Sequence, residues 1–469
     1  MVVITSMKKH SSAPLTWAPA LIMIILACRT NAFFMVTSQQ PKIASPAVFN
    51  KDFTRPMGLP EQSIEAAVDV LRSGRLNRYS CASADTSQVS LLEQEIVEAT
   101  GVQYALGVNS CSSAILIALL SVGVEPGDEV ISNAFTFTAV PSSILRIGAE
   151  PVLVECLDSW AMDLDDLERK IATSKAKVLL LSHMRSKARF PTKNMMVEWC
   201  HVLYCTAPQV CDMDRLLKIC EKNDLTLVED CAHALGVTWR GEQLGSRAKV
   251  AAYSTQADKI INAGEGGFLT TGDEGIIARA IYMSGCYERR YGKHAVRASD
   301  ELMEKAMLSE RNLSVRMNEM TAAVIRPLLA NLPERVAQFN RRYHEVVGIL
   351  EQRVGDLIQV PKPLEHASIV GDHLNFRLIN PTNQENAAFQ AKVKELGVPL
   401  NWLRSSVNAR WHVNWRGYGG PVQDLPATDN ALATAYDLKL PPHFSDEDFV
   451  HLAQNIAHAA RATVRAGKN

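Results

Sequence analysis

The sequence predicts an α/β protein with three layers, a mostly parallel sheet covered by helices on both faces, and a smaller α+β domain at the C-terminal end. Short apolar runs alternate with stretches of helical periodicity from about residue 69 onward, as in strand–helix–strand crossover units. The chain has 469 residues, of which 47% are apolar and 21% charged, enough for a large buried core. Beyond the helix predicted over 321–332 the pattern is less regular, which indicates the second, smaller domain.

The first helix of this alternation is predicted over residues 90–101. Its apolar residues recur at helical spacing, Ser90 is the candidate N-cap with Glu93 three residues later, and Gly101 is the expected stop. The strands predicted after it are 104–108, 129–134, 151–155, 177–181, 225–229, 250–254 and 267–271. The helices predicted between and after them are 112–122, 140–147, 164–171, 213–220 and 321–332. Strands that alternate with helices in this way form parallel sheets with both faces buried.

Three segments are predicted along the chain: a leader over 1–50, a large domain over 51–310 and a small C-terminal domain over 311–469. In the leader, basic residues at 8–10 precede an apolar run at 15–28 and then small residues, an order typical of a secretory signal. The leader also resembles the two-part leader of proteins sent to complex plastids. A cytoplasmic location is the alternative if translation starts at Met35.

The composition favours small molecules as partners. The 49 Lys and Arg residues balance 50 Asp and Glu residues to give a net charge of −1, which provides no attraction to nucleic acid or to an anionic membrane. The apolar run in the leader is shorter than the ~20 residues needed to span a bilayer, and no other run of spanning length follows. We therefore expect no nucleic acid partner and no stable membrane span.

The ten cysteines are sparse for the length of the chain. Those within apolar runs, such as Cys156 and Cys231, are typical of reduced core thiols. One group of potential metal ligands consists of Cys200, His201, Cys205 and Cys211. Its spacing matches no common zinc site, so we predict no metal.

In an open α/β sheet the ligand lies beyond the carboxyl ends of the strands, so polar residues at these ends are functional candidates. The strand ending at Val108 leads through a polar turn into an apolar helix, with Ser112 and Ser113 at its start. Free backbone N–H groups and the helix dipole favour a phosphate there, and both hydroxyls are potential donors. A simple helix cap is the alternative role for either serine.

Other strand ends carry ionisable and aromatic groups. An apolar strand ends at Asp230, with His233 behind, and a buried carboxylate there needs a cationic partner or takes up a proton; a structural salt bridge is the alternative. Lys259 follows the strand that ends at Ser254 and precedes a glycine turn that lets backbone approach a ligand, so its amine is a candidate for a Schiff base. Phe137, at a fourth strand end, is a candidate for covering a flat ring, although core packing is the commoner role.

A phosphate site, a carboxylate, an aromatic ring and a lysine are together what pyridoxal 5'-phosphate requires: an anchor, a partner for the pyridine nitrogen, a stacking surface and an amine. The motifs S-C-S-S-A, P-G-D-E-V-I, V-E-D-C-A-H-A, S-T-Q-A-D-K and G-E-G-G resemble the DegT/DnrJ-type sugar aminotransferase family. The likeness runs from about Ser73 to the final helix. It implies the aspartate aminotransferase fold, which is fold type I of the pyridoxal-phosphate enzymes.

The resemblance implies a role for each candidate residue. Lys259 would bind the cofactor covalently and shuttle a proton, and Asp230 would keep the pyridine nitrogen protonated. His233, where many relatives have Gln, would lie near the ring hydroxyl, and Phe137 would stack on the ring. The phosphate would be held by Ser112, Ser113 and Ser254. The family also implies a homodimer whose active site is shared between subunits.

The sequence departs from the family pattern at three places. Cys111 and Ser112 stand where relatives usually have Gly and Thr, and Ser314 stands where they have the Asn that reaches the neighbouring subunit's phosphate. The third departure is an insertion over 188–209, shortly after His183. It is either a lid near the functional edge of the sheet or a translated intron, and we favour the second.

These features predict an aminotransferase that moves an amino group from an amino acid, with L-glutamate as the expected donor, to a nucleotide-linked keto sugar or a keto-cyclitol. One alternative is a pyridoxal-phosphate-dependent sugar dehydratase, although relatives of that kind have His in place of Lys259. The other is a non-catalytic dimeric regulatory or binding protein. The sequence does not identify the residue that binds the donor carboxylate, for which Arg75, Arg78 and Arg316 are candidates.

Overall fold

The computed structural model describes residues 46–184, 210–362, 364–418 and 423–465, which belong to one compact unit. The predicted leader up to residue 45 and the predicted insertion over 188–209 lie outside the described residues, as do Cys200, His201 and Cys205. The origin of the insertion and the cellular location inferred from the leader therefore stay predictions.

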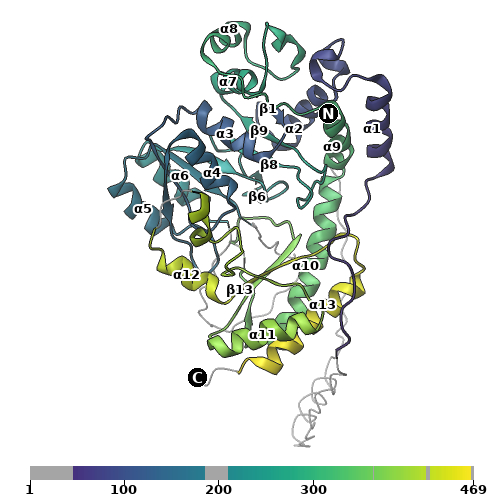
Figure 1. Ribbon diagram of the computed structural model, residues 1–469, viewed down its shortest axis with the longest axis vertical. Coiled ribbons are helices and arrows are strands. Elements are labelled where there is room, and N and C mark those ends of the chain that lie inside the picture. Colours follow the sequence, from purple (N-terminus) through teal and green to yellow (C-terminus); the bar gives the residue numbers. More distant parts are fainter. Residues whose placement is uncertain (1–45, 185–209, 363, 419–422, 466–469) are drawn as a thin grey trace, which may run out of the picture. The chain divides into compact units, whose positions relative to one another are not determined.

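The centre of the fold is a sheet of seven strands in the order β1-β9-β8-β5-β4-β2-β3 (Figure 1). The strands are β1 (Tyr104–Val108), β2 (Glu129–Asn133), β3 (Glu150–Val154), β4 (Val178–Ser182), β5 (Thr226–Asp230), β8 (Val250–Ser254) and β9 (Gly267–Thr271). Neighbouring strands are parallel except where β9 pairs with β1 and with β8. The predicted mostly parallel sheet is confirmed, and its parallel strands share one carboxyl edge, where a ligand is expected.

The side chains of the sheet point alternately into two hydrophobic cores. On β4, Leu179 and Leu181 belong to one core and Val178 and Leu180 to the other, as the alternation of a strand requires. The first core is covered by α2 (Gln88–Thr100), α5 (Leu164–Thr173), α6 (Met213–Lys222) and α9 (Glu319–Ala330). The second is covered by α3 (Cys111–Ser121), α4 (Ala139–Ile147), α7 (Glu274–Ser284) and α8 (Asp300–Ser309). The predicted three layers are therefore present, and α1 (Glu61–Ser73) packs against α9 outside them.

A second sheet is antiparallel and has the strand order β10-β11-β13-β12. Its strands are β10 (Ile358–Gln359), β11 (His373–Leu378), β12 (Asn401–Trp402) and β13 (Ala435–Lys439). The helices of this region are α10 (Leu332–Val354), α11 (Asn383–Glu395), α12 (Pro426–Ala433) and α13 (Asp446–Thr463), of which α10 and α13 pack together (Figure 1). The α+β character predicted for the C-terminal third is confirmed, whereas the domain boundary near residue 310 stays a prediction.

The remaining described elements are short. A hairpin joins β6 (Thr238–Trp239) to β7 (Glu242–Gln243). Short 3₁₀ helices lie at Arg78–Ser80, Ala84–Thr86, Arg290–Lys293 and His412–Tyr418. None of these elements has an apolar run or a periodic pattern, so the sequence did not predict them.

The start of α2 corrects one expectation. The helix begins at Gln88, and Ser87, not Ser90, is the N-cap, because the Ser87 side chain accepts a hydrogen bond from the backbone N–H of Ser90. Glu93 does not cap the helix either: its carboxylate is fully buried and binds both terminal nitrogens of Arg78. The predicted end is confirmed, since Gly101 takes a left-handed conformation with φ of 70°.

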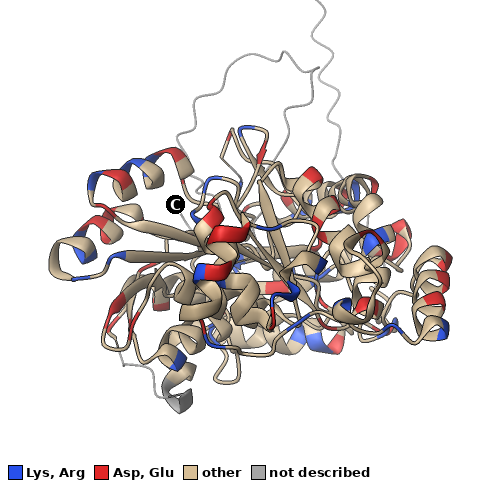
Figure 2. Ribbon diagram, turned by 90° about the horizontal axis from the view of Figure 1, so that it is seen from above, with Lys and Arg blue, Asp and Glu red and all other residues tan. Residues whose placement is uncertain are grey.

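Charges of both signs are interspersed along the described helices (Figure 2). Arg215, for example, bridges Asp165 and Glu168 on the neighbouring helix α5. No helix within the described residues is both long and apolar enough to cross a membrane. The seven cysteines in the described part of the chain are all buried and carry free thiols.

Candidate active site

A cavity of about 330 Å³ lies at the carboxyl edge of the central sheet. Six of the seven predicted site residues line it: Ser112, Phe137, Asp230, His233, Ser254 and Lys259. Cys111, Met184, Gln256, Asp258, Glu265, Gly266 and Arg410 also line it. The residues predicted from the strand ends therefore meet in one cavity, although they are up to 147 positions apart in the sequence, from 112 to 259.

The predicted phosphate end of this cavity is formed by the start of α3. Ser110 is the N-cap, because its hydroxyl accepts a hydrogen bond from the backbone N–H of Ser113. Ser112 is exposed in the first turn and lines the cavity, where free backbone N–H groups favour an anion. Ser113 is not among the lining residues, and its hydroxyl instead donates to Asn109 Oδ1 at 2.7 Å.

Strand β9 holds α3 in place through a close backbone contact at Gly267. A Cβ atom on this residue would lie 2.6 Å from the nitrogen of Cys111, 2.7 Å from the carbonyl carbon of Ser110 and 2.7 Å from the carbonyl oxygen of Tyr253. Backbone atoms cannot move aside as a flexible side chain can. Only glycine therefore lets β8, β9 and the start of α3 meet, and this contact fixes where the helix presents Ser112.

Asp230 ends β5 with a side chain that is only 5% exposed. Its carboxylate accepts hydrogen bonds from Ser182 Oγ at 2.8 Å and from the backbone N–H of Ala232 at 3.0 Å. The thiol of Cys111 lies 3.9 Å from the same carboxylate. Burial and the charge of Asp230 raise the pKa of the Cys111 thiol well above its ordinary value, so this cysteine stays neutral and unreactive.

A buried pair behind Asp230 holds the end of β5 against β4. His183 Nε2 lies 2.6 Å from Glu229 Oε2, and both side chains are about 1% exposed. The backbone N–H of His183 donates to the carbonyl oxygen of Asp230 at 3.0 Å. The Cys231 thiol lies near the same Glu229 carboxylate, at 3.9 Å. The side-chain nitrogen, oxygen and sulfur atoms of these three residues lie within 4.8 Å of one another. The direct contact between His183 and Glu229 is a hydrogen bond, and it fixes the end of β5 that carries Asp230.

Lys259 lies on the loop between β8 and β9. The loop is closed by the hydrogen bonds of Ala263 N to Thr255 O at 2.9 Å and of Ala257 N to Gly264 O at 3.0 Å. The amine of Lys259 reaches His233, with 2.7 Å between Nζ and Nε2. The two residues that the sequence assigned to different functions are therefore in direct contact.

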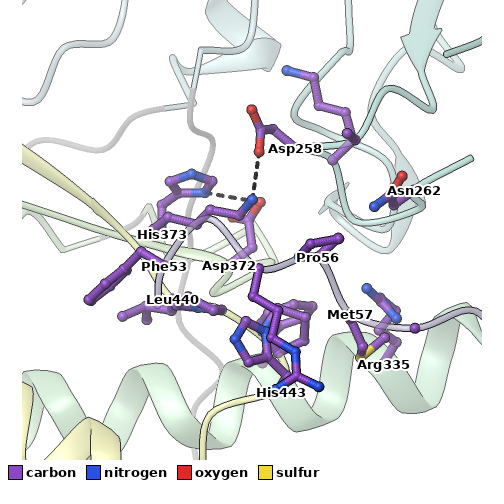
Figure 3. A pocket seen from close by; sticks show the side chains of 18 of the residues that line it. Phe53, Pro56, Met57, Asp258, Asn262, Arg335, Asp372, His373, Leu440 and His443 are labelled. Atoms are coloured by element: carbon purple, nitrogen blue, oxygen red, sulfur yellow. Dashed lines mark hydrogen bonds and ion pairs between the residues drawn. The ribbon is translucent and has the colours of Figure 1, made fainter. Parts of the chain in front are cut away.

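A second, smaller cavity of about 50 Å³ is drawn in Figure 3. It is bounded by the N-terminal segment 53–59, by α10 and by the edges of β11 and β13. Asp258 and Lys259 line both cavities. His373, which begins β11, contacts Asp372, with 3.1 Å between Nδ1 and Oδ2 (Figure 3), and Lys439 of β13 pairs with Asp258. The second sheet thus contributes ionisable groups next to the loop that carries Lys259.

None of the three arginines proposed for the donor carboxylate lines the larger cavity. Arg78 is buried in its ion pair with Glu93. Arg316 donates to Gly285 O and to Ser314 Oγ, and Arg75 is exposed beside a different cavity.

Arg410 is the arginine that lines the larger cavity among the described residues. Its loop is held by side-chain to backbone hydrogen bonds: Arg410 N donates to Asn408 Oδ1 at 3.0 Å, Asn408 Nδ2 to Leu403 O at 3.0 Å, and the Trp415 indole to Ala409 O at 2.9 Å. The segment N-A-R-W-H-V-N-W has none of the features that identified the strand ends, so sequence reasoning missed Arg410.

These groups fit pyridoxal 5'-phosphate. The start of α3 with Ser112 suits the phosphate of the cofactor. Asp230 is buried and its carboxylate accepts two hydrogen bonds, and a carboxylate held in this way suits a pyridinium nitrogen. Phe137 is 47% exposed, a large fraction for an aromatic side chain at a strand end, and it lines the cavity. The cavity volume lies at the lower end of the range for sites that hold small cofactors, ~300–1,000 Å³.

Comparisons with known proteins agree with this fit. The chain matches the DegT/DnrJ/EryC1/StrS aminotransferase family over residues 59–189 and 202–457. It is 31% identical over 312 residues to GDP-perosamine synthase from Caulobacter vibrioides. The matched region covers 64% of this chain and 72% of that protein.

Solved structures share the fold. The aminotransferase from Psychrobacter cryohalolentis superposes with a TM-score of 0.72 at 21% identity, covering 88% of this chain and 100% of that one. DesV from S. venezuelae superposes with a TM-score of 0.67 at 23% identity, covering 85% and 95%. The chain belongs to the DegT/DnrJ/EryC1/StrS aminotransferase family and depends on pyridoxal 5'-phosphate.

Proposed function

We propose that this protein transfers an amino group from L-glutamate to a keto sugar carried on a nucleotide, or to a keto-cyclitol. The observation that carries the proposal is the single cavity in which Lys259, Asp230 and His233 meet. The name of the Caulobacter relative, GDP-perosamine synthase, supports a nucleotide-linked sugar. Named relatives also include L-glutamine:3-amino-2,3-dideoxy-scyllo-inosose aminotransferases, which support the cyclitol alternative.

The residues of the cavity have distinct tasks in this reaction. When bound, the cofactor supplies a conjugated ring that withdraws electrons from the substrate carbon. Asp230 holds a proton on the pyridine nitrogen, and Lys259 Nζ moves a proton between the substrate carbon and the cofactor's aldehyde carbon. Ser112 and Ser254 bind the phosphate group, while Phe137 covers one face of the ring. Ser113 is not among the lining residues and its hydroxyl donates to Asn109 Oδ1, so we do not assign it to the phosphate.

Arg410 binds the carboxylate of the amino-acid donor. A guanidinium group is planar and binds a carboxylate with two parallel hydrogen bonds. The hydrogen bonds of Asn408 and Trp415 fix the loop before a substrate arrives, which reduces the entropy lost on binding. Arg410 therefore replaces Arg75, Arg78 and Arg316 as the proposed clamp.

The working form is a homodimer whose active site is shared. Ser314 stands in the left-handed region with φ of 57°, a conformation that Asn adopts more readily than Ser. It lies on an exposed segment whose next residue, Val315, accepts a hydrogen bond from the backbone of Asn109 at 2.9 Å. This exposed segment lies next to the phosphate end of the cavity, as a contact to the partner's cofactor requires.

The two alternative functions lack comparable support. A sugar dehydratase of this family would have His in place of Lys259. A binding protein without catalytic activity would not need both a buried Asp230 and a lysine in one cavity. Lys259 and Asp230 both line the cavity, so we propose aminotransfer over either alternative.

The visible absorption spectrum of the purified protein tests this function. L-Glutamate should convert the cofactor absorbance to that of the amine form, and a keto sugar should reverse the change. Borohydride followed by mass spectrometry should place the cofactor on Lys259. Lys259→Ala should lose this attachment and nearly all turnover, whereas Lys249→Ala, which removes an exposed lysine paired with Asp273, should keep both. A spectrum that no amino acid changes, or cofactor found on another lysine, would overturn the proposal.

A further inference from the structure

We propose that the small cavity lined by Arg335 and His443 binds one oxyanion group of a substrate, either a carboxylate or a phosphate. The group is the second carboxylate of the amino-acid donor or a phosphate of a nucleotide-linked keto sugar. The inference rests on the proposed function, and it adds an anion subsite to the one that Arg410 provides in the larger cavity.

The size and position of the cavity suit one part of a substrate. Its volume is about 50 Å³, more than the ~10–15 Å³ that a single water molecule requires and less than the ~300–1,000 Å³ of a site for a whole ligand. Asp258 and Lys259 line both this cavity and the larger one. A group of a few atoms therefore fits here, while the rest of its molecule lies at Lys259 in the larger cavity.

Arg335 is a partly buried cation on the wall of this cavity (Figure 3). It extends from α10, and its guanidinium carbon lies 5.7 Å from the centre of the Phe339 ring, one helical turn further on. Its Nε is buried and has no hydrogen-bond partner in the described part of the chain. Desolvation lowers the pKa of the guanidinium group, although the charge of Asp372 acts in the opposite direction. A desolvated cation of this kind is costly, and a bound anion would remove that cost.

His443 supplies a second unsatisfied nitrogen on the same wall (Figure 3). Its Nδ1 is buried and also lacks a hydrogen-bond partner among the described residues. The ring packs edge to face on Phe444, with 4.8 Å between the centroids. In the tautomer that carries a proton on Nδ1, this nitrogen donates a hydrogen bond. Buried polar atoms without partners are exceptions in native proteins, and an anion in the cavity provides a partner for both residues.

The charges around the cavity favour an anion over a neutral group. Among the described residues that line it, four are basic: Arg55, Lys259, Arg335 and Lys439. Two are acidic: Asp258 and Asp372. The Lys439 amine lies 2.5 Å from Asp258 Oδ1, and Asp372 Oδ2 lies 3.1 Å from Nδ1 of His373. Positive charge is therefore in excess, and it raises the local concentration of anionic groups.

The proposed reaction offers two sources for such an anion. L-Glutamate has a second carboxylate besides the one assigned to Arg410, and a nucleotide-linked sugar has phosphate groups. A guanidinium group binds either oxyanion with two parallel hydrogen bonds. The two sources belong to different half-reactions of the enzyme, so an experiment on each half-reaction distinguishes them.

Isothermal titration calorimetry on the full-length chain with bound cofactor tests the subsite without turnover. The probes are glutarate, which has the two carboxylates of glutamate but no amine, and pyrophosphate. Bound cofactor keeps these anions out of the phosphate end of the larger cavity. Arg335→Gln should weaken the binding of at least one probe by about tenfold or more, as expected for the loss of a charge-assisted hydrogen bond. Arg335→Lys keeps the charge and should recover part of this loss.

Steady-state kinetics of the same variant identify the source of the anion. Weaker glutarate binding together with a raised KM for L-glutamate would assign the subsite to the donor carboxylate. Weaker pyrophosphate binding together with a raised KM for the keto sugar would assign it to a phosphate. Either result supports the proposal.

Arg341→Gln is the matched control. Arg341 lies on the same helix, its side chain is 65% exposed and 3.9 Å from Asp446, and it does not line the cavity. Wild-type protein that binds neither probe, unchanged binding in Arg335→Gln, or an equal loss in Arg341→Gln overturns the proposal. If Arg335→Gln does not fold, unchanged binding of both probes in His443→Phe overturns it. Anion binding at Arg335 without any amino transfer would contradict only the proposed function.

Discussion

Single residues in this protein owe their roles to contacts that lie far away in the sequence. From the sequence, Glu93 was expected at the cap of a helix and Arg78 was a candidate for binding the donor carboxylate, yet together they form a buried ion pair. Arg410 was given no role, because the loop that brings it to the cavity belongs to the second sheet. A side chain at the end of a predicted strand can be placed from the sequence, whereas a side chain on an irregular loop cannot, since nothing local fixes its direction.

Replacing Arg410 tests the clamp at this scale. Arg410→Gln should raise the KM for L-glutamate roughly 30-fold, because a charge-assisted hydrogen bond contributes about 2 kcal/mol. The spectrum of the bound cofactor and the half-reaction with the keto substrate should change little. Stopped-flow measurement of the two half-reactions separates these effects.

Arg404→Gln is the matched control for this substitution. Arg404 lies in the same loop and packs over the ring of Trp411, but it does not line the cavity. If both substitutions weaken glutamate binding equally, the loss comes from the loop as a whole, and Arg410 is not the clamp.

At the scale of elements, Gly267 joins β9 to the start of α3. Gly267→Ala should place a methyl group 2.6–2.7 Å from three backbone atoms and push the helix start away from the cavity. We expect the free energy of unfolding to fall by about 1–3 kcal/mol, as for other overpacked sites, and the affinity for pyridoxal phosphate to fall with it. Denaturant titration and absorbance titration measure the two effects.

Gly272 provides the comparison, because it follows the same strand and a Cβ atom there meets nothing within 4 Å. Gly272→Ala should leave both stability and cofactor affinity nearly unchanged. If Gly267→Ala also binds the cofactor normally, then the close contact does not determine where α3 begins its phosphate site.

The strands of the central sheet and the helices α2 to α6 and α9 were predictable from apolar runs and helical spacing, whereas α1, α7, α8 and α10 to α12 were not predicted. The buried strands β4 and β8 are continuous apolar runs bounded by polar residues, and α5 and α6 have one buried face. The exact start of α2 was not predictable, because Ser87 and Ser90 are equivalent as candidates from the sequence. Only the tertiary contact of Glu93 with Arg78 decides between them. Strands of two residues, such as β10 and β12, have no period at all.

At the scale of the whole molecule, we propose that a second copy of the chain binds at a group of exposed apolar residues. Leu71 and Leu76 are 55% and 47% exposed, and Met320 is 39% exposed. The segments of Leu76 and Met320 are adjacent, because Glu319 N donates to Leu76 O at 3.1 Å. Apolar side chains that gather on one exposed surface are typical of an interface.

Light scattering coupled to size-exclusion chromatography tests the dimer. The purified protein should have twice the mass of one chain. Leu76→Glu should shift it to the monomer and, if the site is shared as we propose, weaken cofactor binding. Val48→Glu, at a residue that is 59% exposed and remote in sequence from this surface, should remain dimeric. A monomeric wild-type protein that binds the cofactor fully would contradict a shared site.

The two sheets of the molecule divide the site between them. Ser112, Asp230, Ser254 and Lys259 come from strand ends of the central sheet, whereas Arg410 comes from the loop that follows β12 of the second sheet. During evolution, the second sheet can therefore accumulate changes that alter which substrate is accepted while the chemistry of the cofactor is preserved. Such a division allows one ancestral catalyst to give rise to enzymes for many sugars by remodelling only one of its halves.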